Sequence, residues 1–193
     1  CDGFYVGIWE EARAREPSRG SVASRAQGRL SLKLQAYAFG RPRVLIGDEP
    51  VTQEEWQSPK AKELFYYLLT RSSPLRKESI CADLWPDASP VTADNNFHSS
   101  IRRLRQAIHP AAVALEDGAY EINPHMDIWF DEAVFLDTLE RAERLPRGSP
   151  DRARLLEDAV KCYDGPFLEE FYSEWVETAR RETEALFLRA LSS

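Results

Sequence analysis

One stretch, SPVTADNNFHSSIRRLRQAI at residues 89–108, constrains the fold more than any other part of the chain. Ser89 followed by Pro90 predicts the start of a helix, because serine caps a first turn and proline suits its first position. Apolar residues then recur at helical spacing and predict one buried stripe. The stripe consists of Phe97, Ile101, Leu104 and Ile108.

The opposite face of this predicted helix is polar. At about 100° per residue it carries Thr92, Asn95, Asn96, Ser99, Arg103 and Gln106, with Arg102 at its edge. Amides, hydroxyls and guanidiniums are the groups that read base edges and hold phosphates in DNA. A recognition helix is built in this way, but an ordinary amphipathic surface helix has the same periodicity. The neighbouring stretches must therefore decide between them.

The preceding residues predict strands and then two further helices. Alternating apolar residues indicate strands at residues 30–39 and 44–46, with a short third run around Val51. Helices are predicted at about residues 59–70 and 77–84, each followed by a proline that cannot continue it.

After the 89–108 helix, Asp117-Gly118 lies between two short apolar runs and is a strong signal for a two-residue hairpin turn. The predicted order is three strands, three helices and a hairpin. This is the layout of a winged helix, in which the hairpin is the wing beside the recognition helix.

The chain is predicted to be all helical from Ile128. Three amphipathic helices there suggest the start of a helical-repeat scaffold that is truncated. Residues at the N-terminus read either as the tail of an upstream element followed by a linker, or as a short docking helix. The predicted fold class is an α+β winged helix followed by an all-α, TPR-like helical domain. The expected parts are 1–29, a tail and linker; 30–127, a winged-helix DNA-binding domain; and 128–193, the helical domain.

The net charge and the hydropathy of the chain exclude some classes of protein. The net charge of −7 argues against a protein that coats nucleic acid non-specifically. Residues 30–127 carry 11 Lys and Arg against 13 Asp and Glu, a net charge of −2, whereas residues 128–193 carry 9 against 15, or −6. No signal peptide and no run of about 18 apolar residues is present, so we expect a cytoplasmic protein without a membrane span. Cys1 at the first position indicates a fragment of a longer chain.

The sequence shows no sign of catalysis. Its three cysteines, Cys1, Cys81 and Cys162, lie too far apart for a metal cluster or a disulfide framework. The three histidines have no spacing typical of a metal site. A phosphate-cradling glycine loop and a nucleophile elbow are also missing. We therefore predict no enzyme activity, no cofactor and no metal.

Four motifs occur in an order that is familiar: WQSPKAKELFYYLL, RKESICADLWPD, NNFHSSIRRLRQAI and EDGAYEIN. Together they resemble the OmpR-type winged helix of the Streptomyces antibiotic regulatory protein (SARP) family. Two details differ, since Phe97 stands where the family has leucine and the wing reads Gly-Ala-Tyr, one residue longer than Gly-Tyr.

The following segment resembles the bacterial transcriptional activator domain, a helical module related to tetratricopeptide repeats. Its mark is the run KCYDGPFLEEFYSEWVETARRETEALFLRAL. Both resemblances together cover about residues 30–193. They imply a bacterial transcriptional regulator, an activator on the nucleoid that binds promoter repeats in double-stranded DNA as a dimer or tandem pair and contacts RNA polymerase. The residues that match the module are Tyr163, Gly165, Pro166, Leu168, Trp175 and Arg180.

A recognition helix in the major groove would place five side chains nearest the DNA. Asparagine can pair bidentately with adenine and arginine with guanine. The five predicted DNA-binding residues are Asn95, Asn96, Ser99, Arg102 and Arg103.

Basic residues at the starts of the two preceding helices are candidates for holding phosphate, because helix N-termini add positive partial charge. For each lysine among them, a solvated surface charge is an equally good interpretation. Arg105 lies close to the buried stripe and is expected to be structural or to position phosphate, and His98 is expected to be a surface residue. The predicted phosphate-binding residues are Lys60, Lys62, Arg76 and Lys77.

A second hypothesis is a protein-interaction adaptor that kept the winged helix and TPR-like scaffold but lost DNA binding. Its basis is the net charge of −2 in residues 30–127, which is acidic for a DNA-binding domain. An adaptor would have little reason to present two asparagines, a serine and two arginines on one helix face, so the sequence favours DNA binding.

Overall fold

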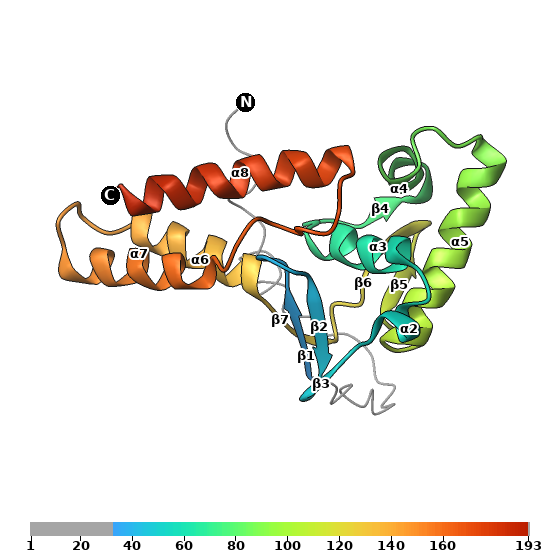
Figure 1. The fold of residues 1–193 in the computed structure, drawn as a ribbon, viewed down its shortest axis with the longest axis horizontal. Coiled ribbons are helices and arrows are strands. Elements are labelled where there is room, and N and C mark those ends of the chain that lie inside the picture. The colour runs from blue at the N-terminus through green and yellow to red at the C-terminus, as the bar shows by residue number, and fades with distance from the viewer. Residues whose placement is uncertain (1–32, 193) are drawn as a thin grey trace, which may run out of the picture.

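The computed structural model describes residues 33–192 and shows an α+β chain built around two small β-sheets (Figure 1). The first sheet has four strands in the order β3-β2-β1-β7. Strand β1 pairs antiparallel with β2 and parallel with β7. The α+β class predicted from the sequence is confirmed. The strands are β1 (Lys33–Tyr37), β2 (Arg43–Ile46), β3 (Glu49–Pro50) and β7 (Asp127–Phe130).

The chain between β3 and β7 contains four helices and the second sheet. This sheet has three strands in the order β4-β6-β5. Because β1 and β7 are neighbours in the first sheet, everything from α2 to β6 is an insertion between two adjacent strands. The elements are α2 (Gln53–Trp56), α3 (Pro59–Leu69), β4 (Leu75–Arg76), α4 (Lys77–Leu84), α5 (Pro90–Ala107), β5 (Val113–Glu116) and β6 (Ala119–Ile122).

The 89–108 helix and the hairpin follow the sequence signals closely. The Ser89 hydroxyl accepts a hydrogen bond from the backbone N–H of Thr92 and caps α5. At the hairpin turn Asp117 and Gly118 have φ angles of 50° and 78°, the left-handed pair that a type I′ turn requires. Both predictions are confirmed.

Two short elements were not predicted. Helix α2 is a single turn closed by a capping box, in which Thr52 and Glu55 bond each other's backbone N–H groups. Strand β4 pairs with β6 and joins the hairpin to the helices. The run expected around Val51 is also displaced, because β3 ends at Pro50. The expected strand residues 30–32 and the N-terminal tail lie outside the described residues.

The prediction that the chain is all helical from Ile128 is wrong for its first three residues. Ile128 and Phe130 face the core while Trp129 points outward, the alternation of a strand. Three helices follow, and α8 lies alongside the α6–α7 pair in Figure 1. They are α6 (Asp131–Glu143), α7 (Pro150–Cys162) and α8 (Glu174–Leu191).

The end of β1 is held by a buried carboxylate. Asp131, the first residue of α6, accepts hydrogen bonds from the backbone N–H groups of Ala38, Phe39 and Glu132 at 2.8–3.0 Å. Since β7 leads directly into α6, this contact fixes the helix to the sheet that carries it.

Asp131→Ala should therefore lower the free energy of unfolding by about 2–5 kcal/mol, since a buried donor left without a partner costs about 1–3 kcal/mol. Urea unfolding measures the change. The control is Asp137→Ala on the same helix, whose exposed carboxylate pairs with Arg141 and should contribute less than about 1 kcal/mol. Equal effects of the two substitutions would contradict this account of β1.

Candidate nucleic-acid interface

Helix α5 presents a polar stripe to solvent from Asn95 to Gln106, and the same face carries an exposed Val91 at its N-terminal end. Asn95 and Arg102 are exposed, seven residues apart and therefore on the same face. Asn96, Ser99 and Arg103 are half-buried on one flank of that stripe. The structure thus brings all five predicted recognition residues to one side of α5, with Asn95 and Arg102 at its centre.

The opposite face of α5 is anchored in the core and against the hairpin. Phe97 is fully buried, and its ring centroid lies 4.8 Å from that of Tyr120 in β6. Arg105 Nη2 donates to the backbone carbonyl of Val113 in β5 at 2.9 Å, so its predicted structural role is confirmed. These contacts hold the hairpin beside the exposed stripe.

His98 belongs to the exposed stripe, although the sequence analysis did not include it among the site residues. It lies three residues after Asn95 and four before Arg102, and it is exposed. Its Nε2 atom is 3.7 Å from Asp94 Oδ1. Helical spacing alone places His98 on this face of α5. The sequence analysis predicted only that it is a surface residue.

Lys77 and Arg76 lie close to α5 and the hairpin respectively. The Lys77 ammonium is paired with the carboxylate of Asp94 on α5, and this bond raises the pKa of the lysine and lowers that of the aspartate. Arg76 is exposed beside the hairpin turn, with Nη1 3.7 Å from where a Cβ on Gly118 would lie. Arg76 is thus the predicted phosphate ligand with the freest access to solvent.

Lys60 and Lys62 face residues 170–173, which precede α8, instead of α5. Lys60 Nζ is 2.8 Å from Glu63 Oε2 and 3.2 Å from Ser173 Oγ. Lys62 is 8% exposed and has Glu170 at 3.4 Å, while desolvation lowers its pKa. The structure does not bring these two ammoniums together with the α5 stripe.

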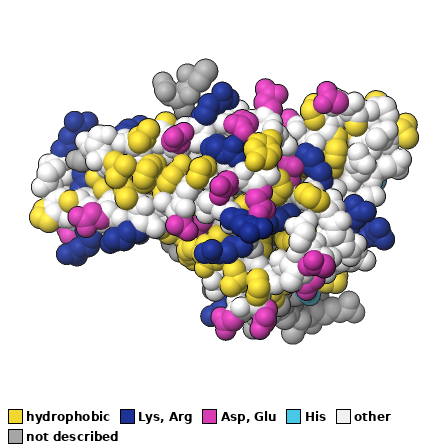
Figure 2. Space-filling model, viewed as in Figure 1, with side chains coloured by type: hydrophobic (Ala, Val, Ile, Leu, Met, Phe, Trp, Pro, Cys, Tyr) yellow, Lys and Arg dark blue, Asp and Glu magenta, His cyan; other side chains and the backbone are white. Residues whose placement is uncertain are grey.

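The hairpin tip is acidic. Glu116 and Asp117 are exposed there, next to an exposed Leu115. Carboxylates repel DNA phosphates, so the positive charge of this end of the molecule comes from α5 and Arg76. On the face drawn in Figure 2, Lys and Arg side chains form separate groups interleaved with Asp and Glu.

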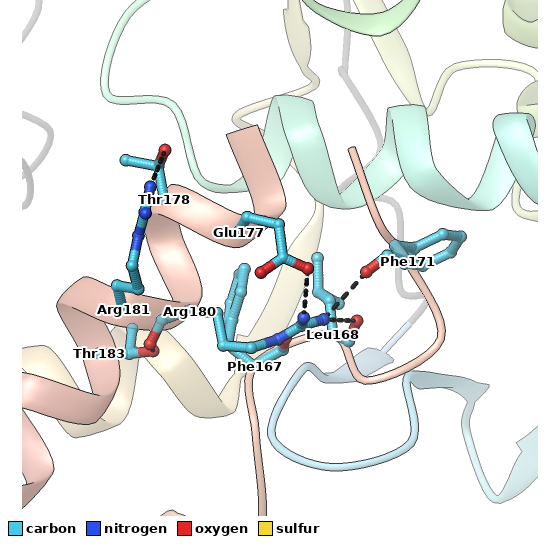
Figure 3. Close-up of polar contacts among 8 residues, drawn as sticks. All are labelled: Phe167, Leu168, Phe171, Glu177, Thr178, Arg180, Arg181 and Thr183. Carbon is cyan, nitrogen blue, oxygen red and sulfur yellow. Dashed lines mark hydrogen bonds and ion pairs between the residues drawn. The ribbon is translucent and has the colours of Figure 1, made fainter. Parts of the chain in front are cut away.

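The segment between α7 and α8, residues 163–173, connects the C-terminal helices back to the first sheet. Leu168 N donates to Ala38 O at 2.7 Å, and Arg180 holds the segment from α8 (Figure 3). The Arg180 guanidinium donates at 2.9 Å to the carbonyls of Phe167, Leu168 and Phe171 and pairs with Glu177. Arg180, matched to the activator module by sequence, is therefore a structural residue of this connection.

The part of the chain that the structure describes contains neither a candidate metal site nor a candidate membrane-spanning helix. Within residues 33–192, no three side chains among His, Cys, Asp and Glu are grouped so that they could hold a metal ion. Each helix in the same range is too short or too polar to cross a membrane.

The comparison with protein families gives a match for the C-terminal segment. Residues 130–193 match the family described as "Bacterial transcriptional activator domain", which is the module that the sequence motifs indicated for this segment. The match covers about a third of the chain and confirms the predicted resemblance of this C-terminal segment to the module.

Among solved structures, the chain is similar to Mycobacterium tuberculosis EmbR, in a complex with a low-affinity phosphopeptide, with a TM-score of 0.65 and 19% sequence identity. The match covers 83% of this chain and 44% of that chain, so this chain spans less than half of the length of the EmbR chain. At this identity the likeness shows the fold. No curated protein matches the sequence significantly.

Proposed function

We propose that the chain is a sequence-specific DNA-binding regulator that reads the major groove with α5. In this proposal residues 30–127 form a winged helix, with β5–β6 as the wing, and residues 128–193 form the TPR-like activator module. The boundary lies within β7, which belongs to the first sheet and leads into α6. One observation carries the proposal: α5 buries its apolar face in the core and leaves a polar stripe exposed from Asn95 to Gln106.

Within this stripe, Asn95 and Arg102 are proposed to contact base edges, because they are exposed at its centre. Asn96, Ser99 and Arg103 are placed to contact the flanking bases and phosphates. Arg76 and Lys77 are proposed to hold backbone phosphate, Lys77 after exchanging its pairing with Asp94. Lys60 and Lys62 are left out of the proposed interface, because their ammoniums face Ser173 and Glu170 and not the α5 stripe.

The finer biological setting follows from the resemblance. We propose an activator that binds promoter repeats as a dimer or tandem pair, contacts RNA polymerase and acts in the cytoplasm on the nucleoid. The matched family is a regulatory one, which supports a regulator over an enzyme.

An adaptor without DNA binding is the second candidate, and the acidic hairpin tip favours it. The salt dependence of binding to a duplex of mixed sequence distinguishes the two functions. For a protein that displaces counterions, the logarithm of the binding constant falls linearly with the logarithm of the salt concentration. The slope is about −0.9 per phosphate contact. An adaptor shows no saturable binding to the duplex at low salt.

Two single substitutions test the phosphate contacts. Arg76→Ala should reduce this slope by about one and weaken all duplexes alike, as expected for a phosphate ligand. Lys62→Ala should leave the slope unchanged, because its ammonium is buried against Glu170. Fluorescence anisotropy at several salt concentrations measures both. A reduced slope for Lys62→Ala and an unchanged one for Arg76→Ala would reverse these assignments.

A further inference from the structure

One carboxylate lies beside the exposed stripe of α5. Asp94 directly precedes Asn95 near the N-terminal end of the helix, and its side chain is 42% exposed. At about 100° per residue, Asp94 lies about 90° around the helix from the midline of the stripe, which Asn95 and Arg102 define. Arg103 lies at the same angle on the other flank. Asp94 is therefore as close to the centre of the stripe as a residue already assigned to DNA binding.

Two side chains hold this carboxylate in the chain without DNA. The Lys77 ammonium, at the start of α4, donates to Asp94 Oδ1. His98, one helical turn further along α5, has its Nε2 atom 3.7 Å from the same oxygen. Among residues 33–192 these are the only polar contacts of the Asp94 carboxylate. Because an ion pair between partly exposed side chains contributes little to stability, Asp94 can exchange this partner for another.

The Asp94 side chain opens to solvent beside Asn95. Both residues line a cleft of about 590 Å³ between α4 and α5, which Lys77 also lines. The hydrogen bond from Lys77 lowers the pKa of Asp94, so this side chain is a carboxylate that only accepts hydrogen bonds. Residues near the N-terminal end of a recognition helix contact base edges. In the major groove a carboxylate there accepts a hydrogen bond from the N4 amino group of cytosine.

We propose that Asp94 is a further base-reading residue of α5, whose carboxylate accepts a hydrogen bond from the amino group of a cytosine. In the chain without DNA, Lys77 pairs with this carboxylate. On DNA the Lys77 ammonium moves to a backbone phosphate and leaves the carboxylate to the base. The inference rests on the proposed function and adds to it a preference for one base. A carboxylate without a cytosine partner repels the DNA phosphates, so the exchange also disfavours other sequences.

Selection of bound duplexes from a pool of randomised DNA, carried out with the parent chain, Asp94→Ala and Asp94→Asn, tests this assignment. The parent motif should contain a cytosine whose preference falls about fivefold or more in Asp94→Ala, while the other positions keep their preferences. Asp94→Asn should prefer adenine at the same position, because asparagine pairs with N6 and N7 of adenine. Circular dichroism verifies that both variants fold.

Two control variants separate base reading from net charge and from the ion pair. Glu78→Gln removes one negative charge from an exposed side chain next to Lys77 and should leave the motif unchanged. Lys77→Met removes the partner of Asp94, so it should weaken binding to all duplexes and keep the preference for cytosine. Loss of that preference in Lys77→Met would overturn the assignment of this base to Asp94.

The outcomes for this inference and for the proposed function are distinguishable. A motif that the parent and both Asp94 variants share at every position would overturn the inference. Loss of the whole motif in both variants would also overturn it, because Asp94 would then support α5 instead of reading a base. In these two cases the parent still enriches a motif, and the proposed function stands. A parent chain that enriches no motif refutes both.

Discussion

Replacing Arg102 and Arg103 by alanine together is expected to reduce specific DNA binding about 30-fold or more. A bidentate arginine–guanine pair contributes about 1–3 kcal/mol of discrimination, and the variant removes two such side chains. Neither guanidinium forms an ion pair with another residue in the described range, so the fold should tolerate the change. Fluorescence anisotropy with a selected operator and with a scrambled duplex measures specific and non-specific affinity.

The matched control for this double variant is Arg147→Ala/Arg154→Ala. It removes the same formal charge at the other end of the molecule, where both arginines are exposed around the α6–α7 turn. We expect it to bind the operator within about threefold of the parent. If the two double variants lose equal affinity, net charge and not the α5 surface governs binding, and the assignment of α5 fails.

Glu63→Ala should lower the free energy of unfolding by about 3 kcal/mol, the largest effect expected for any single change at the contact between α3 and α8. The Glu63 carboxylate is buried, and it accepts hydrogen bonds from Ser173 Oγ and Trp175 Nε1. Lys60 lies beside it at 2.8 Å. Removing the shared acceptor leaves the half-buried indole N–H of Trp175 without its partner and takes the paired carboxylate away from Lys60, and losing the acceptor of several donors at once is costly.

Glu78→Ala is the control for Glu63→Ala, since Glu78 is an exposed glutamate on α4 and should change stability by less than about 0.5 kcal/mol. Urea unfolding followed by tryptophan fluorescence measures both variants. A loss below about 1 kcal/mol for Glu63→Ala would mean that the C-terminal helices are not held to α3 through this carboxylate.

The elements with local signals were predictable from the sequence. The cap at Ser89 and the Asp117-Gly118 turn depend only on neighbouring residues, and the structure has both where they were expected. The exposed stripe of α5 follows from helical periodicity in the same way. Local chemistry decides each of these features, so one sequence was enough.

The features that the sequence analysis missed depend on distant contacts. Strand β7 exists because Asp127–Phe130 pairs with β1, nearly a hundred positions earlier in the chain, and four residues carry little periodicity of their own. From the sequence, Lys62 is predicted to be a phosphate ligand or a surface charge. The structure shows it buried and paired with Glu170, which is far away in the sequence. Helix α2 is different, because its capping box Thr52–Glu55 was visible in the sequence.

The most direct test of the central claim is selection of bound duplexes from a pool of randomised DNA with the parent chain. A sequence-specific regulator that reads DNA through α5 should enrich a common motif over successive rounds. The enrichment should disappear with Arg102→Ala/Arg103→Ala. A folded parent chain that enriches no motif at low salt would contradict the proposal and leave the adaptor function as the better account.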